Sequence, residues 1–131
     1  TCPDPLAAQT RFPLPRPMRG RDDCDFSFSG LKTAMRNHID ALPPGDLNHA
    51  DMAMLAASFE SAMCDIVTDR MARAIDFYLK RYQPATPSMV VSGGVAANLA
   101  LRRALENLAR DHGLTCVAPP LKLCSDNAAM I

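Results

Sequence analysis

Apolar side chains recur every three or four positions in two stretches of the chain, which is the spacing of one face of an α-helix. The first stretch carries Leu31, Met35, Ile39 and Leu42 and stops at Pro43-Pro44. Because proline cannot continue a helix, we expect a short helix between Gly30 and these prolines.

The second stretch predicts a long helix over residues 50–80. Asn48 is a suitable N-cap, and Asp51 follows three positions later, as in a capping box. Arg70 and Arg73 interrupt or flank the apolar stripe, so a break near them is possible. We expect core packing along four apolar positions of this helix: Leu55, Phe59, Ile66 and Ile75.

The segment ahead of these helices has a different character. Residues 1–25 hold five of the eleven prolines, which favour extended backbone, so we interpret the segment as a Pro-rich connection. Its arginines could contact RNA phosphate, but no aromatic residue is interleaved with Arg16, Arg19 and Arg21, which favours a solvated loop. From Asp25 to Ser29 polar and aromatic residues alternate, which predicts a short half-buried strand.

The C-terminal part of the chain predicts a strand, a helix and a second strand. The first strand is Met89–Ser92, and Gly93-Gly94 forms a tight turn after it. The helix extends from Val95 to His112 and is capped by Gly113.

The second strand is predicted over Leu114 to Ala118, followed by a turn at Pro119-Pro120. Ser125 can then N-cap a last helix that begins at Asp126. This order is a βαβ unit, so we expect parallel strands and an α/β fold class.

Composition adds to this picture only by arguing against certain classes of protein. Apolar residues make up 48% and charged residues 21% of the 131 residues, as in a globular domain. The 14 basic and 14 acidic side chains leave no net charge, so the chain lacks the footprint of a strong, independent nucleic-acid binder. No apolar run of about 18 residues and no charged-then-apolar leader is present, which disfavours a membrane span and a signal peptide. Five cysteines without Cys-x-x-Cys spacing favour reduced thiols in an intracellular protein.

Candidate chemistry lies at the ends of the two predicted strands. Gly93 and Gly94 precede a helix, where glycine lets a ligand reach the backbone and N–H groups favour a phosphate, but on spacing alone a bare strand-to-helix turn is the better explanation. Asn98 has an amide suited to ribose hydroxyls or a base edge, or it is a surface asparagine. Asp126 also follows a strand, where open parallel sheets bind ligands. On spacing alone, stabilisation of a helix start is the better explanation of Asp126.

Other chemistries find less support in the sequence. His38, His49 and His112 are far apart and form no His-x-x-x-His pair, so we interpret each as a surface or capping residue. No Ser-His-Asp or Cys-His arrangement is convincing, because no histidine is placed to activate Cys124.

Three segments are more specific together than any one alone. They are Asp25 to Ala34 (DFSFSGLKTA), Val90 to Asn98 (VVSGGVAAN) and Leu123 to Ile131 (LCSDNAAMI). In this order they resemble the tRNA N6-adenosine threonylcarbamoyltransferase family, formerly described as glycoproteases or O-sialoglycoprotein endopeptidases. Leu14 to Met18 also resembles the stretch that precedes the first of these motifs in that family. The resemblance covers essentially the whole chain.

The resemblance implies the ribonuclease H-like fold of actin, Hsp70 and sugar kinases, with two lobes around a cleft. Residues 26–131 would then be part of the C-terminal lobe, truncated at both ends, and residues 1–25 the connecting segment. The implied activity is an acyl transfer. It moves a threonylcarbamoyl group from threonylcarbamoyl-adenylate to N6 of the adenosine 3′ of the anticodon, in tRNAs that read codons beginning with A.

The resemblance also implies roles for single residues. Asn98, with Gly93 and Gly94, would bind the adenylate substrate, and Asp126 would ligate one divalent metal ion, iron or zinc. The family's other two metal ligands form a His-x-x-x-His motif that this sequence lacks, so we expect them in an N-terminal lobe and expect this chain to be inactive alone. Ser125 stands where many relatives have threonine, and no residue here is assigned a catalytic role.

The implied partners are tRNA, a paralogous actin-like protein and, in bacteria, a P-loop ATPase, with no membrane. The implied location is the bacterial cytoplasm, or the mitochondrial matrix in a eukaryote. Two alternatives stay open: a nucleotide-binding kinase or ATPase of the same superfamily, and a non-catalytic partner of the family. Phosphate-binding loops upstream would favour the kinase, whereas retention of Asn98 and Asp126 argues against a degenerate partner.

Overall fold

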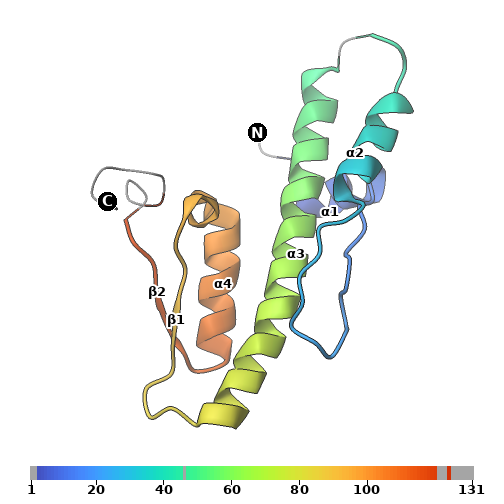
Figure 1. Cartoon of the computed structure of the whole chain (residues 1–131). Coiled ribbons are helices and arrows are strands. Elements are labelled where there is room, and N and C mark those ends of the chain that lie inside the picture. The colour runs from blue at the N-terminus through green and yellow to red at the C-terminus, as the bar shows by residue number, and fades with distance from the viewer. Residues whose placement is uncertain (1–2, 46, 121–123, 125–131) are drawn as a thin grey trace. The chain divides into compact units, whose positions relative to one another are not determined.

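The computed structural model describes residues 3–45, 47–120 and 124, with Val95 as backbone alone. The elements in chain order are α1 (Pro5–Arg11), α2 (Leu31–Asp40), α3 (His49–Tyr82), β1 (Ser88–Val90), the 3₁₀ turn η1 (Gly94–Ala97), α4 (Leu99–Asp111) and β2 (Thr115–Val117) (Figure 1). The chain divides into two compact units, Thr1–Arg70 and Met71–Ile131, and α3 belongs to both. No helix in the described ranges is long and apolar enough to cross a membrane.

Helix α1 lies inside the segment for which the sequence predicted extended backbone. The carboxylate of Asp4 accepts hydrogen bonds from the N–H groups of Leu6 and Ala7, each at 3.3 Å, and Pro5 occupies the first helical position. An acidic N-cap followed by proline is a favourable helix start. The prediction of extended backbone was therefore wrong over Pro5–Arg11, and this helix buries Ala8 completely.

The first unit is built on the N-terminal half of α3, and α2 lies beside it (Figure 1). Leu14, Leu31, Ala62 and Ile66 form its buried cluster, with Met35 and Met63 packed against them. The predicted N-cap is confirmed, because the N–H of Asp51 donates to Asn48 Oδ1 at 2.8 Å. In return, the Asn48 amide donates to the Asp51 carboxylate at 2.8 Å.

Burial of α3 follows the prediction at three of the four named positions. Leu55, Ile66 and Ile75 are each at most 3% exposed, whereas Phe59 is 37% exposed. The exposure of Phe59 is explained by a distant partner of its neighbour. The neighbouring Ser58 is fully buried, and its hydroxyl donates to the carbonyl of Phe12 at 2.6 Å, which turns the Ser58 side of the helix inward.

Two arginines attach the segment before α2 to α3. Arg16 donates to Asp65 Oδ2 at 3.0 Å and to the carbonyl of Leu14 at 2.6 Å. Arg70 is fully buried, pairs with Asp69, and donates to the carbonyls of Asp23 and Arg21 at 2.9 and 3.0 Å. A solvated loop was therefore the wrong interpretation for Arg16, and α3 passes Arg70 without the break that the sequence left possible.

The strand predicted from Asp25 to Ser29 is not formed. The residues have no regular structure, and Phe26 and Phe28 are 45% and 44% exposed. The N–H of Ser29 donates to its neighbour Ser27 Oγ at 3.2 Å, a local bond that competes with strand pairing. Gly30 then begins α2 with a φ of 84°, a left-handed conformation that suits glycine.

The second unit contains the predicted parallel βαβ arrangement. Strands β1 and β2 pair in parallel, with Met89 opposite Cys116, and α4 connects them. Helix α4 buries Leu101, Leu105 and Ala109. It ends before Gly113, which has a φ of 73° and whose N–H donates to the carbonyl of Arg110 at 3.0 Å. These two features confirm the predicted cap. The described part of the chain is thus helix-rich with a small parallel sheet.

Candidate functional site

The glycine pair lies directly beyond the carboxyl end of β1, as predicted. The N–H of Val91 donates to the carbonyl of Val117 at 3.0 Å, so the parallel pairing continues one residue past β1. Gly93 and Gly94 follow within three residues and are both exposed. Ligands of open parallel sheets bind at this edge, outside the carboxyl ends of the strands.

Gly93 needs to be glycine for a conformational reason. Its φ is 88°, and its carbonyl accepts a hydrogen bond from Ala96 N–H at 3.0 Å, which closes the turn into η1. No atom of the described residues lies within 4 Å of a Cβ built at Gly93 or Gly94. Open space above an uncovered backbone allows the close approach of a ligand.

Asn98 is the N-cap of α4. Its Oδ1 accepts a hydrogen bond from Leu101 N–H at 2.8 Å, and its backbone is extended, with φ −70° and ψ 116°. The sequence predicted one continuous helix from Val95, with Asn98 in its first turns. That boundary was wrong, because η1 ends at Ala97 and the extended backbone of Asn98 separates it from α4. The side chain is exposed at the same edge as the glycines.

The segment after β2 is anchored by two residues that the sequence did not single out as tethers. The Arg102 guanidinium of α4 donates to the carbonyl of Pro119. Cys124, only 2% exposed, points its thiol at the carbonyls of Pro119 and Pro120, 3.8 and 3.7 Å away. The predictions for Ser125 and Asp126 lie outside the described residues.

Cys116 does not provide an activated nucleophile. Burial raises the pKa of Cys116, and Glu106 raises it further, against the opposing effect of Arg102. Cys116 is therefore protonated at neutral pH, and a protonated thiol is a weak nucleophile. Cys124 is buried among backbone carbonyls, and the sequence had not favoured it as a nucleophile.

His112 caps the end of α4 and His49 is exposed, as predicted for capping or surface residues, whereas His38 makes a tertiary contact. His38 Nε2 hydrogen bonds with the carbonyl of Pro13 at 2.8 Å, and His112 Nδ1 with the carbonyl of Leu108 at 2.9 Å near the end of α4. Among residues 3–45, 47–120 and 124, no three His, Cys, Asp or Glu side chains are grouped so that they could hold a metal ion. The described residues alone therefore do not make a metal centre.

Residues 3–131 match the family of tRNA N6-adenosine threonylcarbamoyltransferases. The chain belongs to this family. It is 53% identical over 121 residues to the tRNA N6-adenosine threonylcarbamoyltransferase of Rhodospirillum rubrum, covering 92% of this chain and 33% of that protein. It is 52% identical over 124 residues to the proteins of the same name from Brucella ovis and Brucella canis, covering 94% of this chain and 34% of each relative.

This chain therefore spans about a third of the length of the threonylcarbamoyltransferases that it matches. The matched region includes the glycine pair and Asn98 at the carboxyl edge of β1, and it extends across Asp126.

Proposed function

We propose that this chain forms part of an enzyme that transfers a threonylcarbamoyl group from threonylcarbamoyl-adenylate to N6 of an adenosine in tRNA. The acceptor would be the adenosine 3′ of the anticodon in tRNAs reading codons that begin with A. The observation that carries the proposal is the family match over residues 3–131, together with the exposed Gly93-Gly94 turn at the carboxyl edge of a parallel sheet.

In this proposal the β1–α4 loop binds the adenylate. Gly93 and Gly94 leave room for the nucleotide to lie against the backbone. The start of α4 carries the positive end of the helix dipole, which favours the adenylate phosphate. Asn98 would use its Oδ1 for the helix cap and its amide N–H groups for a hydroxyl or base edge of the substrate.

Asp126 would supply one ligand of a divalent metal ion, iron or zinc. A carboxylate oxygen is an accepted ligand for either ion, but a catalytic site usually has about three protein ligands. Since the relatives are about three times as long as this chain, the other ligands would come from the part of those proteins that it does not span. An ion held there would polarise the carbonyl group under attack.

The wider setting follows from the same proposal. The chain would belong to the C-terminal lobe of an actin-like, ribonuclease H-like fold, and its helix-rich unit with a parallel strand pair is compatible with that fold. Function would also involve a paralogous actin-like protein and, in bacteria, a P-loop ATPase. The enzyme would work in the cytoplasm, or in the mitochondrial matrix of a eukaryote.

The proposal is tested by incubating the intact protein and its partners with threonylcarbamoyl-adenylate and a tRNA that reads a codon beginning with A. Digestion of the tRNA to nucleosides and mass spectrometry should detect adenosine that has gained a threonylcarbamoyl group. A matched tRNA for codons beginning with another base should remain unmodified. Phosphoryl transfer from ATP without any modified adenosine would contradict the proposal and favour a kinase of the same superfamily.

A further inference from the structure

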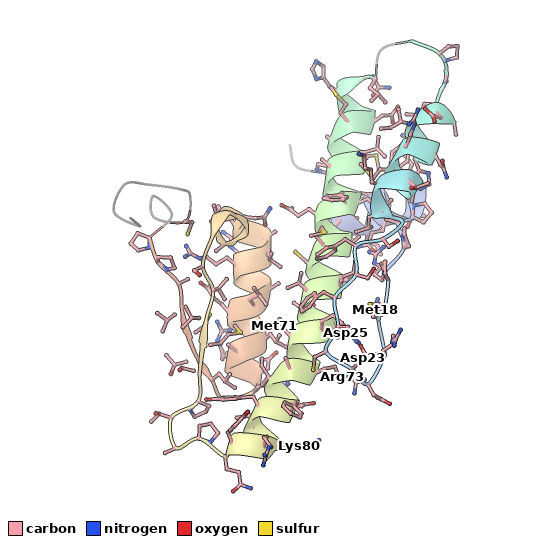
Figure 2. All side chains as sticks on the ribbon, viewed as in Figure 1. Met18, Asp23, Asp25, Met71, Arg73 and Lys80 are labelled. Carbon is pink, nitrogen blue, oxygen red and sulfur yellow. The ribbon has the colours of Figure 1, made fainter. Side chains whose placement is uncertain are left out.

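The C-terminal end of α3 combines positive charge with aromatic side chains, a combination for which the proposed chemistry gives no role. In a chain without net charge, residues 71–83 contain one acid, Asp76, and three cations: Arg73, Lys80 and Arg81. The same thirteen positions contain three aromatic residues: Phe77, Tyr78 and Tyr82. Arg73 and Lys80 are labelled on this part of α3 in Figure 2.

On one side of this helical segment, the three cationic residues lie three or four positions from a single exposed aromatic ring. Phe77 is 60% exposed, and Lys80 and Arg81 are exposed as well. Positions three and four residues apart share a helix face, so Lys80 and Arg81 flank the ring on one side and Arg73 flanks it on the other. We call these four residues the α3 cationic face.

Other side chains of the segment pack inward or make an ion pair, while Tyr82 and Gln83 are exposed. Ile75 is buried, and with Met71 and Tyr78 it lines an apolar cavity against Met89 of β1. The carboxylate of Asp76 lies 3.8 Å from His112 Nε2. The cationic face therefore lies on the side of α3 away from the core of the second unit, and the only acid of the segment is close to a histidine.

We propose that the α3 cationic face binds unpaired RNA, with a base stacked on Phe77 and the backbone phosphates held by Lys80 and Arg81. Exposed aromatic rings flanked by cations are the usual means by which proteins bind single-stranded nucleic acid without reading its sequence. The inference rests on the proposed function, because tRNA is the substrate of that reaction, and it places one RNA contact on the described surface.

The chemistry of the face favours RNA over a protein helix. A helix docking on α3 would need apolar neighbours at the positions around Phe77, but three of its four neighbours are Arg73, Lys80 and Arg81. The other arginine-rich stretch of the chain, around Arg16, lacks an interleaved ring, and Arg16 itself is engaged by Asp65.

The test measures binding of the intact protein to a fluorescent anticodon stem-loop from a tRNA that reads a codon beginning with A. Phe77→Ala should weaken the Kd roughly tenfold, within the range of one lost stacking contact. The double variant Lys80→Gln, Arg81→Gln should reduce the dependence of log Kd on log salt by about 0.7 for each lost phosphate contact. Phe77→Trp, which keeps a stacking surface, should bind like the unmodified protein.

Tyr82→Ala is the matched control, because Tyr82 is 65% exposed and lies five residues later, roughly 140° around the helix. It should leave the Kd unchanged, and thermal melts should show all variants folded. Equal effects of Phe77→Ala and Tyr82→Ala, or full binding by Phe77→Leu, would overturn the inference. If the intact protein transfers threonylcarbamoyl normally and Phe77→Ala binds the stem-loop with an unchanged Kd, the RNA-binding role of this face is wrong and the proposed function stands. If the variants show the predicted binding pattern but the intact protein transfers no threonylcarbamoyl group, the RNA-binding role stands and the proposed function is wrong.

Discussion

At the scale of single residues, Asn98 has one observed role, as a helix cap, and one proposed role, in substrate binding. Its Oδ1 caps α4 through Leu101 N–H, a role that the structure shows directly. Its nitrogen is a donor at the exposed edge beside Gly93 and Gly94, and the proposed substrate contact uses that donor. A substitution that keeps the oxygen and removes the donor separates the two roles.

Asn98→Asp should therefore keep the cap and the stability of the fold while lowering threonylcarbamoyl transfer by the intact protein. Asn98→Ala should lose both, with a cost of about 1 kcal/mol in unfolding free energy. Urea unfolding and the transfer assay, run on the same preparations, provide the two readouts. Full transfer by the Asp variant would show that Asn98 is a helix cap and nothing more.

The thiol of Cys64 on α3 makes a second prediction at this scale. Burial raises its pKa above the ordinary value of 9.0, and the nearby carboxylates of Glu60 and Asp65 raise it further. The folded state therefore favours the protonated thiol. The stabilisation from this thiol is present below about pH 9 and is lost as the pH rises through the folded-state pKa.

Iodoacetamide labelling followed by peptide mass spectrometry measures this shift, because only the thiolate reacts. Cys64 should label at a higher pH in the folded protein than in urea, and Glu60→Gln should move its profile toward lower pH. Cys24, which is exposed, serves as the internal reference for reagent access. Identical profiles for Cys64 in the folded and urea-unfolded states would contradict the assignment.

At the scale of elements, the sequence predicted the features that are encoded locally. The N-cap at Asn48 and the end of α4 at Gly113 each depend on a few neighbouring residues, and both are confirmed. The parallel pairing of β1 with β2 was predicted from the order strand, helix, strand, and it is confirmed as well. The predictions failed where a distant partner decides. The alternating residues from Asp25 to Ser29 needed a strand to pair with, and the burial of Ser58 in place of Phe59 depends on the carbonyl of Phe12.

Arg70 is the clearest case of a partner that periodicity cannot reveal. In the sequence it looked like an interruption of an apolar stripe, because its bonds reach almost fifty residues back to Arg21 and Asp23. Figure 2 labels Asp23 in the loop that this side chain holds against α3. Its fully buried guanidinium fixes that loop immediately ahead of the DFSFSGLKTA motif.

Arg70→Leu should cost roughly 3 kcal/mol in unfolding free energy, because it removes a fully buried guanidinium that donates to the carbonyls of Asp23 and Arg21 and pairs with Asp69. Arg36→Leu is the matched control, since Arg36 is 82% exposed and forms only a surface pair with Asp40. That pair should contribute about 0.5 kcal/mol or less. Urea unfolding of both variants checks the difference, and equal losses would mean that Arg70 does not anchor the loop.

At the scale of the whole molecule, a few short motifs identified the family, whereas the site can be placed only in part. The glycine turn and Asn98 are located by a strand and a helix within the described residues, so the sequence could predict their shared edge. The proposed metal ligand Asp126 lies outside those residues. A metal site assembled from several lobes cannot be deduced from one carboxylate, because its other ligands are distant in sequence.

The central proposal is that this chain supplies part of the threonylcarbamoyl transfer site, with Asp126 as one ligand of its metal ion. Asp126→Asn tests it, because this substitution keeps the shape of the side chain and removes its negative charge. Asp111→Asn is the control, since Asp111 is an exposed acid at the C-terminal end of α4. The measurement is threonylcarbamoyl incorporation into tRNA by the intact protein, with metal content and a thermal melt on the same samples. We expect Asp126→Asn to lose both incorporation and bound metal while its melting temperature and the Asp111→Asn control stay unchanged. Unaltered incorporation and metal content in Asp126→Asn would contradict the account.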